Sequence, residues 1–211
     1  MKKHLPLILL FLACISADAP TAPPAYSNDF EKAKLGPVPD DLMPLNGTFT
    51  IVDVDKNKCL ELAPNPLGGN GFLFGPAGAV TGTVSARIWS APTGRRFPEF
   101  GIGANDAGGY KLILVPAQGI LELRKGEDAV ASVPFQCKPQ SWTRFALQVK
   151  KKSDGKFAIN GKAWLDGSAE PTAWMLTAKT PDVPPAGRAS AWGMAYSGKP
   201  IRFDDLAYRP Q

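Results

Sequence analysis

Short stretches in which apolar and polar residues alternate recur along most of this chain, and they constrain its fold more than any other feature. In the segment Arg144–Lys150, the residues Phe145, Leu147 and Val149 share one side, and the intervening residues are mostly polar. Successive side chains of a β-strand point to opposite faces, so this pattern gives one buried and one solvent-facing side. No window of about 11 residues shows sustained helical periodicity. The sequence therefore predicts an all-β protein.

Turn-forming residues separate the alternating segments, as in Asn105–Gly109 and Ser153–Gly155. Gly, Asn and Asp supply the positive φ angles and the side-chain hydrogen bonds that tight hairpins need. Many short strands with close turns are typical of a sandwich or a barrel. The predicted strands are Phe49–Val54, Cys59–Leu62, Phe72–Phe74, Val84–Trp89, Phe97–Ile102, Tyr110–Val115, Ile120–Arg124, Ala129–Phe135, Trp142–Lys150, Lys156–Ile159, Lys162–Leu165, Thr172–Thr177, Ala189–Met194 and Ile201–Tyr208.

The first residues have the order of a secretory signal peptide, with basic residues, then an apolar run over 5–13, then small residues over 16–19. We expect cleavage after Ala17, because a cut after Ala19 would place Pro20 next to the scissile bond. Lipidation at Cys14 stays open, since Leu12-Ala13-Cys14 resembles part of a lipobox. The predicted organisation is a signal peptide over 1–17, a Pro/Ala-rich linker over 18–28 and one domain over 29–211.

Composition excludes several function classes. Removing Lys2 and Lys3 from the 24 basic residues leaves 22 against 19 acidic ones, a net charge of +3. These charges are scattered, which does not favour nucleic-acid binding. The single histidine, His4, lies in the signal peptide, so the mature chain has no Ser-His-Asp triad, Cys-His pair or histidine-ligated metal site. No segment after the signal peptide is apolar enough for a transmembrane helix.

Two cysteines remain in the mature chain, Cys59 and Cys137. An oxidising compartment would permit a disulfide between them. The alternative, which we favour, is two separate small apolar residues, because a disulfide needs a defined distance that sequence does not give.

Several segments carry a family resemblance. The opening and closing stretches resemble concanavalin A-like jelly rolls: Asp29–Glu31, Gly47–Val52 and Ile201–Leu206. Three interior stretches resemble an exported laminin-G-like group of bacterial proteins common in planctomycetes and verrucomicrobia: Phe72–Pro76, Gly94–Gly101 and Gly187–Gly193. The resemblance implies a jelly-roll β-sandwich of two antiparallel sheets. It implies no activity, because one fold hosts many functions.

Two catalytic relatives of this fold have recognisable motifs. Laminarinase-type glucanases carry Glu-x-Asp-x-x-Glu on one strand, and the 3-keto-disaccharide hydrolase-like domains, which this chain resembles in architecture, carry an Asn-Ser-Gly-Ile segment. Neither motif occurs here. Both absences weaken an interpretation as an enzyme.

The resemblance also implies a structural calcium ion between the chain ends, at positions that match Glu31 and Asp205. Calcium needs six to eight oxygen ligands, so backbone carbonyls would have to supply most of them. The alternative is that Asp204 and Asp205 cap a strand end and pair with Arg202 or Arg209. In the last strand the apolar residues Ile201 and Phe203 occupy odd positions, whereas Leu206 and Tyr208 occupy even ones. This switch at Asp204-Asp205 predicts a bulge or a change of burial there.

Alternation places Arg87 and Trp89 on one face of a strand, as a sugar-binding surface requires. Nearby strands and turns offer further polar and aromatic partners for a sugar, namely Arg96, Glu99, Tyr110, Glu122 and Arg124. The alternative is that the tryptophans fill the core and the charges pair structurally. Glu99 and Glu122 are the best pair for acid-base hydrolysis, but sequence does not give their separation.

We therefore expect a non-catalytic carbohydrate-binding or adhesion module, exported to the periplasm, the cell surface or the medium, with a glycan or cell-envelope polysaccharide as partner. One alternative is a glycoside-processing hydrolase that uses acidic residues on the concave sheet face. A second is a structural envelope domain that binds another protein. Apart from calcium, the sequence predicts no cofactor, and it does not predict the oligomeric state.

Overall fold

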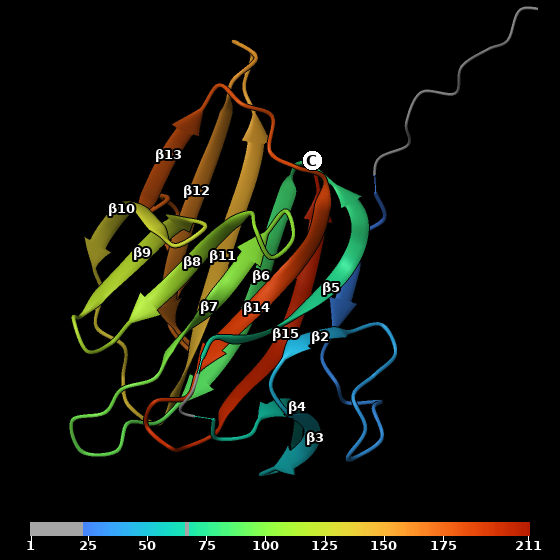
Figure 1. Ribbon diagram of the computed structural model, residues 1–211, viewed down its shortest axis with the longest axis vertical. Coiled ribbons are helices and arrows are strands. Elements are labelled where there is room, and N and C mark those ends of the chain that lie inside the picture. The colour runs from blue at the N-terminus through green and yellow to red at the C-terminus, as the bar shows by residue number, and fades with distance from the viewer. Residues whose placement is uncertain (1–22, 66–67) are drawn as a thin grey trace, which may run out of the picture.

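The computed structural model describes residues 23–65 and 68–211, which form fifteen β-strands and contain no helix (Figure 1). The predicted signal peptide, Cys14 and residues 18–22 lie outside the described residues. The strands are β1 (Tyr26–Asn28), β2 (Met43–Asn46), β3 (Phe49–Val54), β4 (Asn57–Leu62), β5 (Asn70–Ala79), β6 (Gly82–Ser90), β7 (Glu99–Ala104), β8 (Tyr110–Val115), β9 (Ile120–Lys125), β10 (Asp128–Pro134), β11 (Ser141–Lys151), β12 (Phe157–Leu165), β13 (Leu176–Thr180), β14 (Gly187–Met194) and β15 (Ile201–Pro210).

The strands form two antiparallel sheets that pack face to face. Sheet A has the order β13-β12-β11-β6-β15-β4-β3, with β1 also paired to β15. Sheet B has the order β10-β9-β8-β7-β14-β5-β2 and is the layer nearer the viewer in Figure 1. This arrangement confirms the predicted all-β, two-sheet sandwich. Within the described residues, no helix has the length and apolar character needed to cross a membrane.

The core lies between the sheets and is built by alternation along each strand. In β6, Val84, Ala86 and Ile88 are buried in the core, and the residues between them face outward. Aromatic side chains join the two sheets, since Phe72 of sheet B meets Phe203 of sheet A edge to face at 5.2 Å between ring centroids. Each fully buried phenylalanine contributes about 2–3 kcal/mol through removal of its surface from water.

The observed strands differ from the predicted ones mainly at edges and at one glycine. Strands β1 and β2 were not predicted, and β1 falls in the segment assigned to the linker. Two predicted segments form the single strand β12, which runs through Asn160-Gly161. A Cβ at Gly161 would lie 2.6 Å from Leu112 of the other sheet. The glycine therefore permits close packing between sheets and does not form a turn.

The phase switch in the last strand is confirmed. The pairing of β15 with β6 shifts register between Asp204 and Ala207, and Asp205 has a φ of 50°. A bulge inserts one extra residue and re-aims the side chains around it. Because of the bulge, the neighbouring carboxylates of Asp204 and Asp205 both reach arginines on the outer face of sheet A.

Candidate functional site

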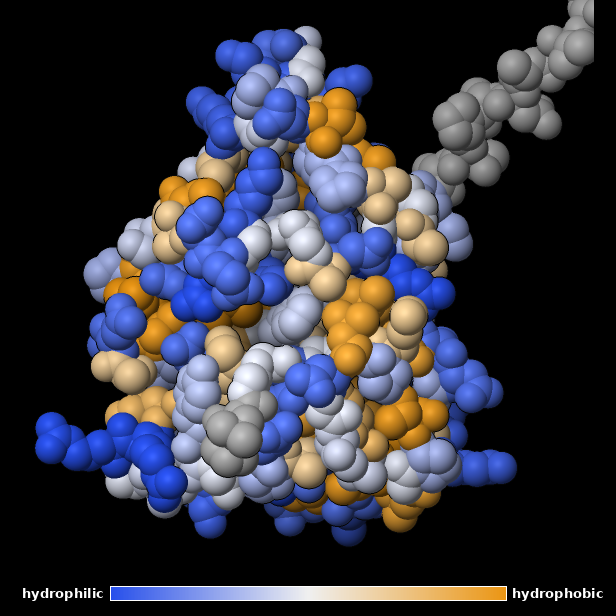
Figure 2. All heavy atoms as spheres, viewed as in Figure 1, coloured by the Kyte–Doolittle hydropathy of each residue, from blue (hydrophilic) through white to orange (hydrophobic). Residues whose placement is uncertain are grey.

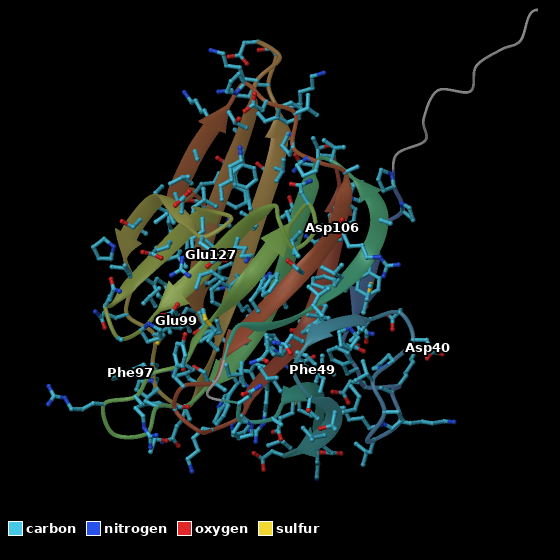
Figure 3. The ribbon with its side chains drawn as sticks, viewed as in Figure 1. Asp40, Phe49, Phe97, Glu99, Asp106 and Glu127 are labelled. Atoms are coloured by element: carbon cyan, nitrogen blue, oxygen red, sulfur yellow. The ribbon has the colours of Figure 1, made fainter. Side chains whose placement is uncertain are left out.

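The residues predicted to form one sugar-binding face lie on opposite sides of the sandwich. Arg87 and Trp89 extend from β6 on the outer face of sheet A. Glu99, labelled in Figure 3, begins β7, and Glu122 and Arg124 extend from β9, all on the outer face of sheet B. Since the hydrophobic core separates the two faces, these five residues do not line a single site.

The remaining two predicted residues lie elsewhere. Tyr110 is 5% exposed and belongs to the core. It points to the same side of β8 as the buried Leu112, two residues further along the strand. Arg96 is exposed in a tight turn closed by hydrogen bonds with Thr93. Neither is placed to join a surface with Glu122 or Trp89.

On sheet B, Arg124 holds both candidate catalytic carboxylates. Its Nη2 lies 2.6 Å from Glu122 Oε2 and 3.4 Å from Glu99 Oε2. Because both oxygens reach the same nitrogen, they lie within about 6 Å of each other, a separation near that of a retaining glycosidase. The guanidinium, however, lies beside both oxygens, where such an enzyme must admit a glycosidic bond. The three side chains form a closed ion cluster.

Trp192, on the same outer face, is also covered by contacts with neighbouring residues. Trp192 of β14 packs on Gly71, where a Cβ would lie 2.7 Å from the indole ring. Its Nε1 donates a hydrogen bond to Ser190 Oγ at 2.8 Å. The Lys111 ammonium lies over the ring, 4.1 Å from its centroid, in a cation–π contact. Figure 2 looks onto this face and shows hydrophilic side chains interspersed with apolar ones over β8–β10.

On sheet A, Arg87 and Asp204 form a buried pair. Arg87 Nη2 donates to Asp204 Oδ2 and to Asn57 Oδ1, both at 2.6 Å, and its guanidinium stacks on Trp142 at 4.7 Å. Asp204 is 1% exposed, and burial raises the pKa of its carboxyl, partly offset by Asn57 and Arg87. For Arg87, burial acts to lower the pKa, but the Asp204 charge and its neighbours raise it overall.

Arg144 extends this network toward solvent. Its Nε donates to Asp166 Oδ1 at 2.5 Å and its Nη2 to Asp205 Oδ2 at 3.0 Å. Arg87 Nε lies 3.3 Å from the same Asp205 oxygen. The Arg144 and Asp205 side chains are each 35% exposed, so they form the part of the network that a solute can reach.

Two cavities, of about 830 and 160 Å³, open beside this network on the outer face of sheet A. Ser85, Arg144, Asp205 and Arg209 line both, so the cavities adjoin each other. The chain segment 29–40, here called the N-terminal arm, lines the larger one. Trp164 lines the smaller one. We call the combined cavity the sheet A trough.

Small side chains form the floor of the sheet A trough. The register places Ser85 of β6 directly opposite Ala146 of β11 and Ala207 of β15, and Ala207 opposite Ser27 of β1. Ser85 and Ala207 face outward, because the residues on either side of each belong to the core. The next row along the strands carries the large charged side chains, including Arg144. The change in side-chain size between adjacent rows creates the hollow.

The proposed calcium ligands have other partners. Asp205 faces the guanidinium groups of Arg87 and Arg144, and the Glu31 carboxylate accepts a hydrogen bond from the Lys58 amide at 3.1 Å. A divalent cation beside two guanidinium groups is electrostatically unfavourable, so these residues do not fit a calcium ion. Among residues 23–65 and 68–211, no group of three or more His, Cys, Asp or Glu residues could hold a metal.

The two cysteines are separate thiols. Cys59 of β4 is fully buried, and burial together with the Asp204 charge raises the pKa of its thiol to about 12. Burial also raises the pKa of Cys137. Both thiols therefore stay protonated near neutral pH and are poor nucleophiles.

Sequence reasoning missed three residues of this site. Arg144 and Asp166 belong to the ion-pair network of Arg87, and Arg209 lines both cavities. Alternation already places Arg144 on the polar side of its strand, between Thr143 and Phe145, which are buried. Asp166 lies in the turn after β12 and joins the network only through the tertiary fold. Arg209 follows the bulge in β15, which changes the face that a simple count of alternating positions would assign to it. Asp204 and Asp205 pair with Arg87 and Arg144, not with Arg202 or Arg209 as the sequence suggested, and Arg202 pairs with Glu61.

Comparisons with protein-family models and with curated protein sequences give no match. Solved structures are similar in fold. Lectin II from Ulex europaeus matches with a TM-score of 0.53 and 6% identity, covering 89% of this chain and 97% of that one. The apo Crh5 transglycosylase matches with a TM-score of 0.57 and 12% identity, covering 89% and 83%. A protein of unknown function from Shewanella oneidensis MR-1 matches with 0.54 and 12%, covering 93% and 90%. The fold is thus a concanavalin A-like jelly-roll sandwich.

Proposed function

We propose that this chain is a non-catalytic carbohydrate-binding module that holds a glycan in the sheet A trough. The observation that carries the proposal is the trough itself, a hollow of about 830 Å³ with a second cavity of about 160 Å³ beside it. Its small floor admits a saccharide ring, while Arg144, Asp205 and Arg209 offer donors and acceptors to sugar hydroxyls. A concave site with a few fixed polar groups is the usual form of a ligand-binding surface.

The fold supports a carbohydrate ligand by analogy. Two of the similar structures are named as a lectin and a transglycosylase, and a third is named as lectin UEA-II complexed with galactose. Their identity to this chain is low, so the analogy supports the ligand class and no particular residue.

The sequence supports export. Basic, apolar and small residues follow one another over residues 1–17 in the order of a signal peptide, and the chain resembles an exported laminin-G-like group. A module outside the cytoplasm would meet cell-envelope or environmental polysaccharides, which fits a glycan partner.

Binding is better supported than hydrolysis. The two best carboxylates, Glu99 and Glu122, share the guanidinium of Arg124 and are only 24% and 14% exposed. General acid catalysis needs one carboxyl group that can carry a proton and reach the leaving oxygen. Because Arg124 contacts both carboxylates, a structural role for Glu99 and Glu122 is favoured.

Blocking the trough tests the proposal. Ser85→Trp places an indole on the floor, and we expect it to weaken binding of a glycan identified on a glycan array at least about tenfold, or 1.4 kcal/mol. Ser132→Trp is the matched control, because Ser132 is exposed on β10 of the opposite sheet. Isothermal titration calorimetry measures both affinities, and circular dichroism checks that both variants fold.

Three outcomes would contradict the proposal. The first is an array on which no plant, algal or bacterial glycan binds. The second is unchanged affinity for Ser85→Trp together with lost affinity for Ser132→Trp. The third is release of reducing sugar that disappears on Glu99→Gln or Glu122→Gln, which would support the hydrolase instead.

A further inference from the structure

We propose that the sheet A trough selects polysaccharides that carry carboxylate groups. This inference rests on the proposed function and adds the chemical class of the ligand. It follows from the charges that line the trough and from which of them already have partners.

The exposed network at the trough is internally neutralised. Arg144 and Asp205 pair at 3.0 Å, and Asp205 also contacts Arg87 at 3.3 Å. Because this carboxylate faces two guanidinium groups, it repels an approaching anion less than a free aspartate would. Of the network, only Arg144 and Asp205 line the trough, and this pair shapes one wall without adding net charge to the lining.

Three other cations line the trough without an ion-pair partner in residues 23–65 and 68–211. Lys32 and Lys34 come from the N-terminal arm, and Arg209 comes from β15. No ion pair involves any of the three within this part of the chain. Arg209 lines both cavities, so it can contact a ligand in either one.

Three carboxylates besides Asp205 line the trough, and one of them, Glu170 in the smaller cavity, is paired with Lys162 at 2.8 Å. Asp29 Oδ1 accepts a hydrogen bond from the Glu31 amide at 3.2 Å, so this side chain is engaged in the turn of the arm. Asp40, labelled in Figure 3, also lines the larger cavity. Among the described residues, three cations without an ion pair therefore face two carboxylates without one, Asp29 and Asp40, which leaves one excess positive charge around the hollow.

Chain ligands match this arrangement. The cations come from two separate elements around one hollow, so a polymer with a carboxylate on each sugar can meet more than one of them. An arginine binds a carboxylate through two parallel hydrogen bonds, which adds geometric specificity. A neutral glycan would offer these cations hydroxyl oxygens but no opposite charge.

Matched polymers test the selectivity. Polygalacturonate and its fully methyl-esterified form share one backbone and differ in charge. Using the purified full chain at low salt, we expect polygalacturonate to bind about tenfold to thirtyfold more tightly than the ester. The difference should shrink at 1 M salt, where the Debye length falls to about 3 Å.

Variants place the effect in the trough. Arg209→Ala should weaken polygalacturonate binding about threefold to tenfold, and Lys32→Ala/Lys34→Ala should add a similar loss. Arg95→Ala is the matched control, since Arg95 is exposed in the turn before β7 and does not line either cavity. Asp40→Ala removes an opposing charge and should tighten binding about twofold or more.

The outcomes separate this inference from the proposed function. Equal binding of acid and ester, both blocked by Ser85→Trp, would keep the glycan site and overturn the acidic selectivity. Equal losses for Arg209→Ala and Arg95→Ala would show general charge attraction and also overturn it. Binding that survives Ser85→Trp would overturn both, as would failure of either polymer and of every neutral glycan to bind.

Discussion

The two outer faces of this sandwich carry similar charged and aromatic residues, but they differ in whether a cavity lies beside those residues. On sheet B, Arg124 contacts both glutamates, and Lys111 lies over the Trp192 ring. On sheet A, Arg87 and Arg144 are engaged in the same way with aspartates, but a hollow of about 830 Å³ lies beside them. Charged and aromatic residues on a sheet face are therefore not enough to identify a site.

Side-chain size in the neighbouring row explains the difference. On sheet A the row next to the charged network consists of Ser27, Ala207, Ser85 and Ala146. Sheet B also has small outward residues, such as Gly71, but the Trp192 ring packs on it. The N-terminal arm then walls the hollow on sheet A. A site arises where small residues lie beside fixed charges and no larger side chain packs over them.

The largest expected effect comes from removing the central arginine of each face. Arg87→Met leaves the Asp204 carboxylate, 1% exposed, without its cation, and should lower the free energy of unfolding by about 3–5 kcal/mol. Arg124→Met leaves glutamates that are 14% and 24% exposed, and should cost about 1–2 kcal/mol. Urea unfolding followed by tryptophan emission measures both.

A second change checks the cause. Arg87→Met/Asp204→Leu removes the orphaned charge and should recover part of the loss seen for Arg87→Met. Equal costs for the two arginine variants, or no recovery in the double variant, would contradict the view that the sheet A pair is the more buried of the two.

Most of the fold could be predicted from the sequence because strand alternation is a local property. Phe145, Leu147 and Val149 were assigned to a buried side and belong to the core. The bulge at Asp204-Asp205 could also be predicted from its phase switch. Strands that depend on tertiary context could not. Strand β2 is an exposed edge strand that contains Pro44, so it has no buried face to produce alternation.

The site could be predicted only in part, because alternation gives the face of a strand but not the sheet that the strand joins. Arg87 and Glu122 each face outward as their phases require, yet β6 belongs to sheet A and β9 to sheet B. Sheet membership is decided by long-range pairing, such as β6 with β15. The trough also needs the N-terminal arm, whose position over sheet A follows from β1 pairing with β15.

The two thiols allow a smaller test of how well sheet A excludes water around Asp204, because burial and the Asp204 charge both raise the pKa of Cys59. The pKa of Cys59 is raised to about 12 from its usual value of 9.0, so the folded chain keeps this proton while the unfolded chain loses it. This contribution to stability is fully present below pH 9.0 and is lost as the pH rises toward about 12. Its size is of the order of 1–4 kcal/mol.

Cys59→Ala should therefore flatten the fall in stability above pH 9.0, measured by urea unfolding at several alkaline pH values. A thiol reagent at pH 8 should modify the half-buried Cys137 before the buried Cys59. Rapid modification of both thiols in the folded protein, or an unchanged alkaline slope in Cys59→Ala, would show that this part of sheet A is more open than the structure indicates.

The smallest expected effect concerns the cover over sheet B. Lys111→Ala removes the ammonium that lies 4.1 Å from the Trp192 centroid, together with its aliphatic stem. The loss of stability should be at most about 1 kcal/mol, because the Lys111 ion pair reaches a Glu127 that is 88% exposed. Acrylamide quenching of tryptophan emission should rise, since one ring face becomes accessible. Lys125→Ala is the control, because its ammonium lies near Tyr110 and no tryptophan. If quenching is unchanged, Lys111 does not close this face, and the contrast between the two sheets rests on the trough alone.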